Sequence, residues 1–158
     1  MNRARLYNDF IDAVKGQLPE IKHVDLWNRN IEFIEQEDWF MPAVFLEFGE
    51  IIWSASKVDK DTIDYKGKGT LTIHIVTPWD GSASADSPAR NLLLRYFDLS
   101  ARIQKIMELM EGEDYGGIWL NSTKTNHDHA DIVENIDIYV VTFHRRVSRI
   151  QTSSGDES

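Results

Sequence analysis

The pattern of hydrophobic and polar positions is organised around residues 42–53, a mostly apolar stretch that we predict to form the first long strand of a sheet. Val44, Leu46 and Phe48 fall on one face by the two-residue period of a strand. Pro42 has no amide hydrogen to donate, which suits the first position of a strand. Gly49 interrupts the run, so we expect a β-bulge or bend before the apolar residues that end the segment.

Four further segments have strand patterns. Residues 69–76 alternate most regularly, while residues 23–27 and 118–126 predict shorter strands. Residues 135–144 form the final predicted strand, which carries apolar side chains on both faces. A strand that is apolar on both sides is typical of the interior of a sheet, so we expect this one to have neighbours on both edges.

Two segments have helical periodicity. In residues 3–18, Leu6, Phe10 and Val14 recur at helical spacing, and Pro19 ends the pattern. The second helix is predicted from 88 to about 111, with Ser87 as its N-cap and Pro88 at its first position. Its expected buried stripe consists of Leu92, Tyr96, Leu99, Ile103, Ile106 or Met107, and Met110.

The element order α-β-β-β-α-β-β predicts an α+β fold, with a mainly antiparallel sheet of four to five strands and two helices packed on one face. We expect one domain at residues 1–150, followed by a disordered polar tail at 151–158. Residues 54–68 are polar and too long for a tight hairpin, so we predict a loop that projects as an arm between two strands.

With two helices on one face, the other face of the sheet is predicted to be open. We assign Phe45, Tyr139, Val141 and Phe143 to this open face. They represent more apolar area than the surface of a monomer needs, and such patches usually mark an interface. The pattern therefore predicts oligomerisation.

Composition excludes several classes of function. The chain of 158 residues has no cysteine, which removes disulfides, thiolate zinc sites and cysteine nucleophiles. Its formal net charge of −9 argues against a general nucleic-acid-binding surface. No apolar run approaches the ~20 residues of a membrane span, and the N-terminus lacks a signal-peptide core, so we expect a soluble protein made in a cytoplasm.

Candidate chemistry centres on histidines. His127 and His129 flank Asp128 and are candidate metal ligands, but a third ligand at a recognisable spacing is missing, and a loop with local hydrogen bonds explains them as well. His74 beside two threonines, or His144 beside Thr142, lacks the nucleophile elbow that catalysis would need. We therefore predict no catalytic residues, no metal, no cofactor and no enzymatic activity.

An acidic segment with aromatic residues precedes the first long strand. Glu32, Glu35, Glu37 and Asp38 surround apolar residues that include Phe33, Trp39 and Phe40. One interpretation is a solvated loop. We favour a docking segment whose aromatic side chains anchor a neighbour and whose charges meet a basic strip at Arg145, Arg146 and Arg149.

The predicted arm carries mixed charges. Lys57, Lys60, Lys66 and Lys68 alternate with aspartates, so the arm is almost neutral, unlike a DNA-binding grip. We interpret it as a solvated projection or an arm between subunits, with Lys57, Lys60 and Tyr65 as candidate contact residues.

Taken together, these segments resemble the small tail-completion proteins of tailed bacteriophages and prophages, of the tail-terminator or neck type. The resemblance runs to about residue 147, and none of its pieces is a catalytic signature. The segments that carry it are the N-terminal helix, residues 23–27, 40–48 with Trp53, 67–76, the long helix, 123–131 and 142–145.

The resemblance implies a structural protein of the virion that assembles as a six-membered ring. Such a ring ends polymerisation of the tail tube and offers a surface to the head connector, while DNA passes through its lumen without specific binding. Residues 54–68 would then reach a neighbouring subunit, and the second sheet face would pack between subunits. The alternatives are another neck or tail component, such as a head-closure or tube protein, or a small metal-dependent enzyme using His127, Asp128 and His129.

Overall fold

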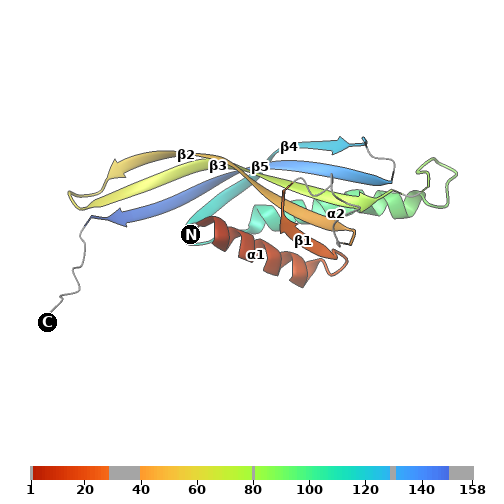
Figure 1. The fold of residues 1–158 in the computed structure, drawn as a ribbon, viewed down its shortest axis with the longest axis horizontal. Coiled ribbons are helices and arrows are strands. Elements are labelled where there is room, and N and C mark those ends of the chain that lie inside the picture. Colours follow the sequence, from red (N-terminus) through yellow and green to blue (C-terminus); the bar gives the residue numbers. More distant parts are fainter. Residues whose placement is uncertain (1, 29–39, 80, 129–130, 150–158) are drawn as a thin grey trace.

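In the part of the chain that the structure describes, the sheet has five strands, and both helices lie on one of its faces (Figure 1). The computed structural model describes residues 2–28, 40–79, 81–128 and 131–149. Its elements are α1 (Asn2–Gln17), β1 (His23–Leu26), β2 (Ala43–Lys57), β3 (Thr62–Pro78), α2 (Arg90–Leu109), β4 (Tyr115–Asn126) and β5 (Ile132–Ser148). The strand order is β1-β2-β3-β5-β4, and only the β1–β2 pair is parallel among these strands. The predicted α+β class is confirmed.

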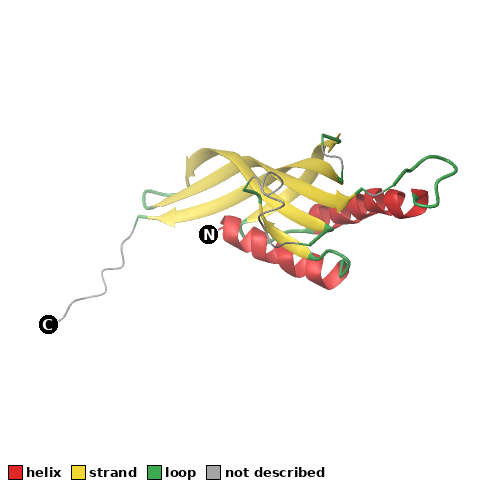
Figure 2. Cartoon of the chain, turned by 45° about the vertical axis from the view of Figure 1, so that its right-hand side comes forward, coloured by secondary structure: helices red, strands yellow, loops and turns green. Residues whose placement is uncertain are grey.

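The main core lies between the sheet and the two helices. From α1 it receives Leu6, Phe10 and Val14, which recur every four residues and are almost completely buried. The strands contribute the apolar residues of one face, including Ile73 of β3 and Tyr139 of β5. Because both helices bury their stripes against the same side, the opposite side of the sheet carries no helix formed by the described residues (Figure 2).

A buried carboxylate ties α2 to the sheet. Asp137 of β5 is fully buried and accepts hydrogen bonds from Ser100 and Gln104 of α2, at 3.2 and 3.1 Å. Thr123 of β4 donates a third hydrogen bond at 2.7 Å. A buried charge is tolerated when hydrogen bonds of this kind replace its hydration.

The long hairpin differs from its prediction. Residues 54–68 are not a loop, because β2 continues to Lys57 and β3 begins at Thr62, which leaves a short turn between them. These strand ends pair with each other and with β5 as far as Ser148, so three strands project beyond the helices (Figure 1). The bulge expected near Gly49 is confirmed by a register shift between Phe48 and Ile51.

The second helix begins two residues later than predicted. Its N-cap is Ala89, whose side chain makes no capping hydrogen bond, while Ser87 accepts a hydrogen bond from the Ala89 amide in the turn before it. Within the helix, Leu93 lies in the core and Leu92 is 54% exposed, so the expected position of Leu92 in the buried stripe is wrong.

The predicted open face is also wrong in its residues. Tyr139, Val141 and Phe143 are buried beneath the helices, whereas Phe45 lies on the opposite face. Phe45 is itself buried in a small second cluster with neighbours on β2, β3 and β5. The helix-free side of β5 is instead formed by alternating residues that include Ile138 and Val140, which are half-buried.

Candidate interaction surface

The projecting part of the sheet consists of residues 49–57 of β2, 62–70 of β3 and 141–148 of β5, and we call it the arm. Its helix-free face carries nine side chains, arranged in three rows across the three strands by the pairing register; we call these side chains the arm surface. They are Ile52, Ser54 and Ser56 on β2, Asp64, Lys66 and Lys68 on β3, and Thr142, His144 and Arg146 on β5.

Positive charge predominates on the arm surface. Its one carboxylate, Asp64, accepts two hydrogen bonds from the guanidinium of Arg146, at 2.6 and 2.9 Å. These hydrogen bonds lower the pKa of Asp64 below its ordinary value and raise the pKa of Arg146. Lys66 and Lys68 are exposed and have no ion pair within the described part of the chain, so two ammonium groups remain available to a partner.

The helix-facing side of the arm carries aromatic side chains. Trp53 packs near Phe143 and edge-on to Tyr65, with ring centroids 6.4 and 6.5 Å apart. Gly67 lies directly beneath Trp53, and a Cβ atom there would come within 2.8 Å of the indole ring. The absent side chain therefore lets Trp53 lie close to β3 while 41% of it stays exposed.

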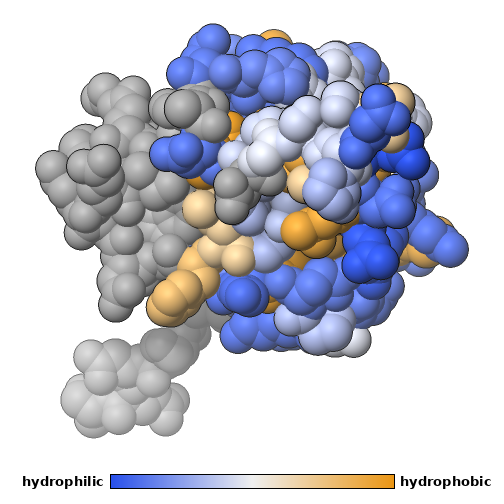
Figure 3. All heavy atoms as spheres, turned by 90° about the vertical axis from the view of Figure 1, so that its right-hand side faces the viewer, coloured by the Kyte–Doolittle hydropathy of each residue, from blue (hydrophilic) through white to orange (hydrophobic). Residues whose placement is uncertain are grey.

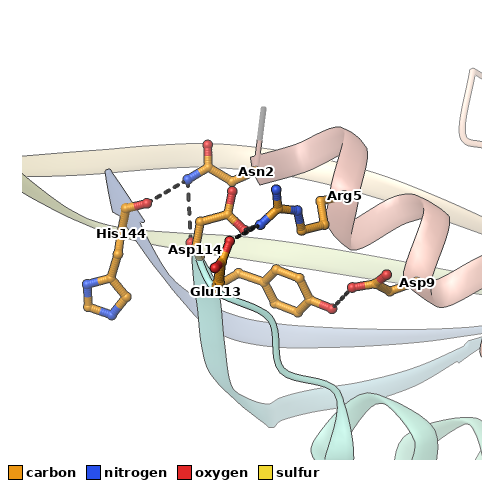
Figure 4. A network of polar contacts seen from close by, with 7 residues as sticks. Asn2, Arg5, Asp9, Glu113, Asp114 and His144 are labelled. Atoms are coloured by element: carbon orange, nitrogen blue, oxygen red, sulfur yellow. Dashed lines mark hydrogen bonds and ion pairs between the residues drawn. The ribbon is translucent and has the colours of Figure 1, made fainter. Parts of the chain in front are cut away.

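A polar network holds the base of the arm against α1 (Figure 4). The side-chain amide of Asn2 donates to the carbonyl oxygens of Asp114 and His144, at 3.4 and 2.9 Å. Arg5 pairs with the carboxylates of Glu113 and Asp114, at 3.2 and 3.3 Å. An open groove of about 980 Å³ adjoins this network, and six of the nine arm-surface residues line it. The groove also takes in Ala55, Tyr65 and Arg145, which form a row on the helix-facing side of the arm.

A buried histidine lies at the other end of the helix-free face. The two ring nitrogens of His74 are each 2.7 Å from a carboxylate oxygen, of Glu134 and Glu47 respectively. Trp27 stacks on the imidazole, with ring centroids 3.7 Å apart and planes 4° from parallel. Both nitrogens are occupied, so the imidazole is placed to link β2, β3 and β5 and to anchor Trp27 rather than to accept a proton from a substrate.

The sequence did not indicate this cluster. It suggested Thr70 and Thr72 as partners of His74, because they share its face of β3. The observed partners come from neighbouring strands, and only the register of β2 and β5 against β3 brings Glu47 and Glu134 to the ring.

Of the predicted contact residues, Arg146 is part of the arm surface, and Arg145 and Tyr65 line the adjoining groove. Lys57 and Lys60 lie at the exposed tip of the arm, and Phe40 is 66% exposed at the far end of β2. Phe45, Tyr139 and Val141 are buried within the chain itself, so they are not available to a neighbour in this structure. Phe33 and Trp39 lie outside the described residues.

The sequence missed three parts of this surface as contacts. Lys66 and Lys68 were interpreted as part of a neutral loop, although their two-residue spacing puts both on one face of a strand. Ile52 is 69% exposed on the same face, and Trp119 of β4, which is 60% exposed, pairs with Val140 there.

The metal prediction concerns a loop that is only partly described. His127 is exposed, whereas His129 lies outside the described residues. Among residues 2–28, 40–79, 81–128 and 131–149, no group of three His, Cys, Asp or Glu side chains is placed to hold a metal ion.

The end of the molecule opposite the arm shows hydrophobic atoms in separate patches on a largely hydrophilic surface (Figure 3). Leu92, Leu94 and Phe97 of α2 are between 40 and 54% exposed. In the described part of the chain, no helix is long and apolar enough to cross a membrane.

Comparison of the sequence with protein-family models and with curated proteins gives no match.

Proposed function

We propose that this chain is a structural protein of a tailed-bacteriophage particle: a tail terminator that forms a ring, caps the tail tube and joins it to the head connector. The observation that carries the proposal is the arm, which extends three paired strands beyond the hydrophobic core and exposes large apolar side chains. Ile52 is 69% exposed there, and Val58 at the turn is 53% exposed. Exposed apolar residues on a projecting element are typical of a contact with another subunit.

The shape of the molecule favours a head-to-tail assembly. The arm lies at one end, while the exposed apolar residues of α2 lie towards the other (Figure 1). A contact between two different surfaces of identical copies is heterologous, and it closes into a ring when the rotation between neighbours permits. In this proposal the partners are further copies in a six-membered ring, the tail-tube protein and the neck proteins, and DNA passes through the lumen without specific binding.

Electron microscopy of negatively stained protein, combined with mass photometry, tests the proposal. We expect rings in the purified full-length chain, and rings at the ends of tail tubes when tubes are added. Long cylinders formed by the chain alone would indicate a tube protein instead. A chain that stays monomeric at high concentration, even with tail tubes present, would contradict the proposal.

A further inference from the structure

We infer that the arm surface of one copy binds the acidic segment at residues 31–39 of the next copy. The inference rests on the proposed self-assembly and specifies the contact that would produce it. The groove beside the arm surface has polar and cationic walls, and its two acids from the base network, Glu113 and Asp114, are already paired with Arg5. The third carboxylate of the groove, Asp64, is paired with Arg146, so an occupant with negative charge meets Lys66, which has no ion pair in the described part of the chain.

The segment has the matching chemistry. Residues 31–39 contain Glu32, Glu35, Glu37 and Asp38, and they contain no lysine or arginine. The same segment carries apolar and aromatic side chains. On the arm side, Ile52 pairs with Lys68 and is 69% exposed, and Trp119 of β4 pairs with Val140 on the same face and is 60% exposed. Apolar anchors beside charge pairs are the usual composition of a specific protein contact.

The contact is assigned to neighbouring copies because the inference rests on the proposed self-assembly. The Trp27 amide is hydrogen-bonded to the Leu46 carbonyl, and the chain re-enters the sheet at Ala43, so both ends of the segment are held at the core part of the sheet. A segment that bound the arm of its own copy would satisfy the same charges without joining two copies, and the wild-type chain would then stay monomeric.

A contact between the arm of one copy and the segment of the next uses two different surfaces. Each copy then has one arm surface to offer and one segment to donate, so the contact repeats around a ring or along a filament. The angle between neighbouring copies decides whether the assembly closes into a ring or extends as a filament. The residues that form the contact are the same in both cases.

Charge reversal tests the contact in the full-length chain. We expect Lys66→Glu with Lys68→Glu to weaken self-association about tenfold or more, because like charges then face each other. Glu35→Lys with Glu37→Lys is expected to have the same effect. A chain with all four substitutions should recover assembly, and so should a mixture of the two double variants, since every contact in an alternating assembly then pairs opposite charges. Sedimentation velocity measures each association.

Lys15→Glu with Lys105→Glu is the matched control, because it makes the same charge change on exposed helix positions away from the arm. Circular dichroism checks that each variant is folded. Three results would overturn the inference. They are undiminished assembly of either double variant, failure of the four-fold variant or of the mixture to recover assembly, and a monomeric wild-type chain. Loss of oligonucleotide binding with unchanged assembly would assign the lysines to nucleic acid and overturn it as well. Filaments, or rings that ignore tail tubes, would contradict the terminator proposal and leave this contact intact.

Discussion

Two buried tyrosines differ in whether their hydroxyl groups find a partner. The Tyr139 hydroxyl is fully buried under α2 and has no hydrogen-bond partner in the described structure. The Tyr115 hydroxyl donates to the carboxylate of Asp9, which links β4 to α1 (Figure 4). Removing the two hydroxyl groups should therefore have opposite effects on stability, because an unpaired buried polar group costs free energy and a paired one stabilises.

We expect Tyr139→Phe to raise the free energy of unfolding by about 1 kcal/mol and Tyr115→Phe to lower it by a similar amount. Urea denaturation followed by circular dichroism measures both values. A loss of stability in Tyr139→Phe would show that the hydroxyl has a partner, such as an internal water.

The same variant changes the response to alkaline pH. Burial raises the pKa of Tyr139, and the nearby Asp137 and Glu108 raise it further. The pKa of Tyr139 in the folded state lies above the unfolded value of about 10. The contribution of this group to the free energy of unfolding is therefore complete below about pH 10 and declines as the pH rises above it. Tyr139→Phe should reduce the slope of stability against pH by about 1.4 kcal/mol per pH unit above pH 10. The pKa values of Tyr7 and Tyr115 are also raised, so part of the dependence of stability on pH remains in Tyr139→Phe.

At the scale of elements, the arm depends on glycine where its strands meet. A Cβ atom at Gly67 would lie 2.7 Å from the Ile51 side chain and 2.8 Å from Trp53. We expect Gly67→Ala to displace Trp53 and to destabilise the arm locally by about 1–3 kcal/mol. Hydrogen exchange should rise in the arm while α1 and α2 keep their protection.

Gly16 offers the matched control for this substitution. It is exposed near the end of α1 and has open space where a Cβ atom would lie. Gly16→Ala should therefore stabilise the protein by up to about 1 kcal/mol through helix propensity. Faster exchange in the helices of Gly67→Ala would mean that the arm and the core unfold as one unit.

Periodicity predicted the elements well where one face of an element is buried. The α1 stripe and the alternation of β3 both follow the core they cover. It failed in the arm, where residues 54–57 are exposed on both faces and carry no apolar alternation. Ile63 and Tyr65 do alternate with polar neighbours at 62–66, but this short stretch lies in a polar segment and was interpreted as part of the loop. On β5 both sets of alternate residues are apolar, so the pattern alone could not tell which set faces the helices. That ambiguity placed Tyr139 and Val141 on the wrong side.

Periodicity did not predict the buried polar residues, for a different reason. Asp137 and Glu134 are polar positions in the final strand, and a polar position in a strand usually faces solvent. Their burial depends on donors from α2, β3 and β4, which only the folded sheet brings together. Of the candidate surface, the sequence identified Arg146 and the presence of a projecting arm, but not the rows that join Lys66 and Lys68 to it.

At the scale of the whole molecule, the core and the arm belong to one continuous sheet and overlap only at the base of the arm, where Ile51, Val141 and Phe143 pack with the core. None of the described core residues lies between 54 and 66, and the helices cover the other part of the sheet (Figure 2). The arm therefore adds paired backbone and exposed side chains with little hydrophobic burial. Such an extension contributes little to folding, which is consistent with a role in contacts between copies.

Shortening the arm separates these two roles. Trp53 and Gly67 are paired residues on β2 and β3, so an Asn-Gly turn replacing residues 54–66 joins them as a hairpin. We expect the shortened chain to keep its helical circular dichroism and to unfold cooperatively, because its core is intact, but to lose self-association in sedimentation velocity. Rings formed by the shortened chain would mean that the arm is not the contact between copies. Loss of cooperative unfolding would mean that the core needs the arm, and the charge-reversal variants, which keep the arm's full length, would then provide the sharper test of assembly.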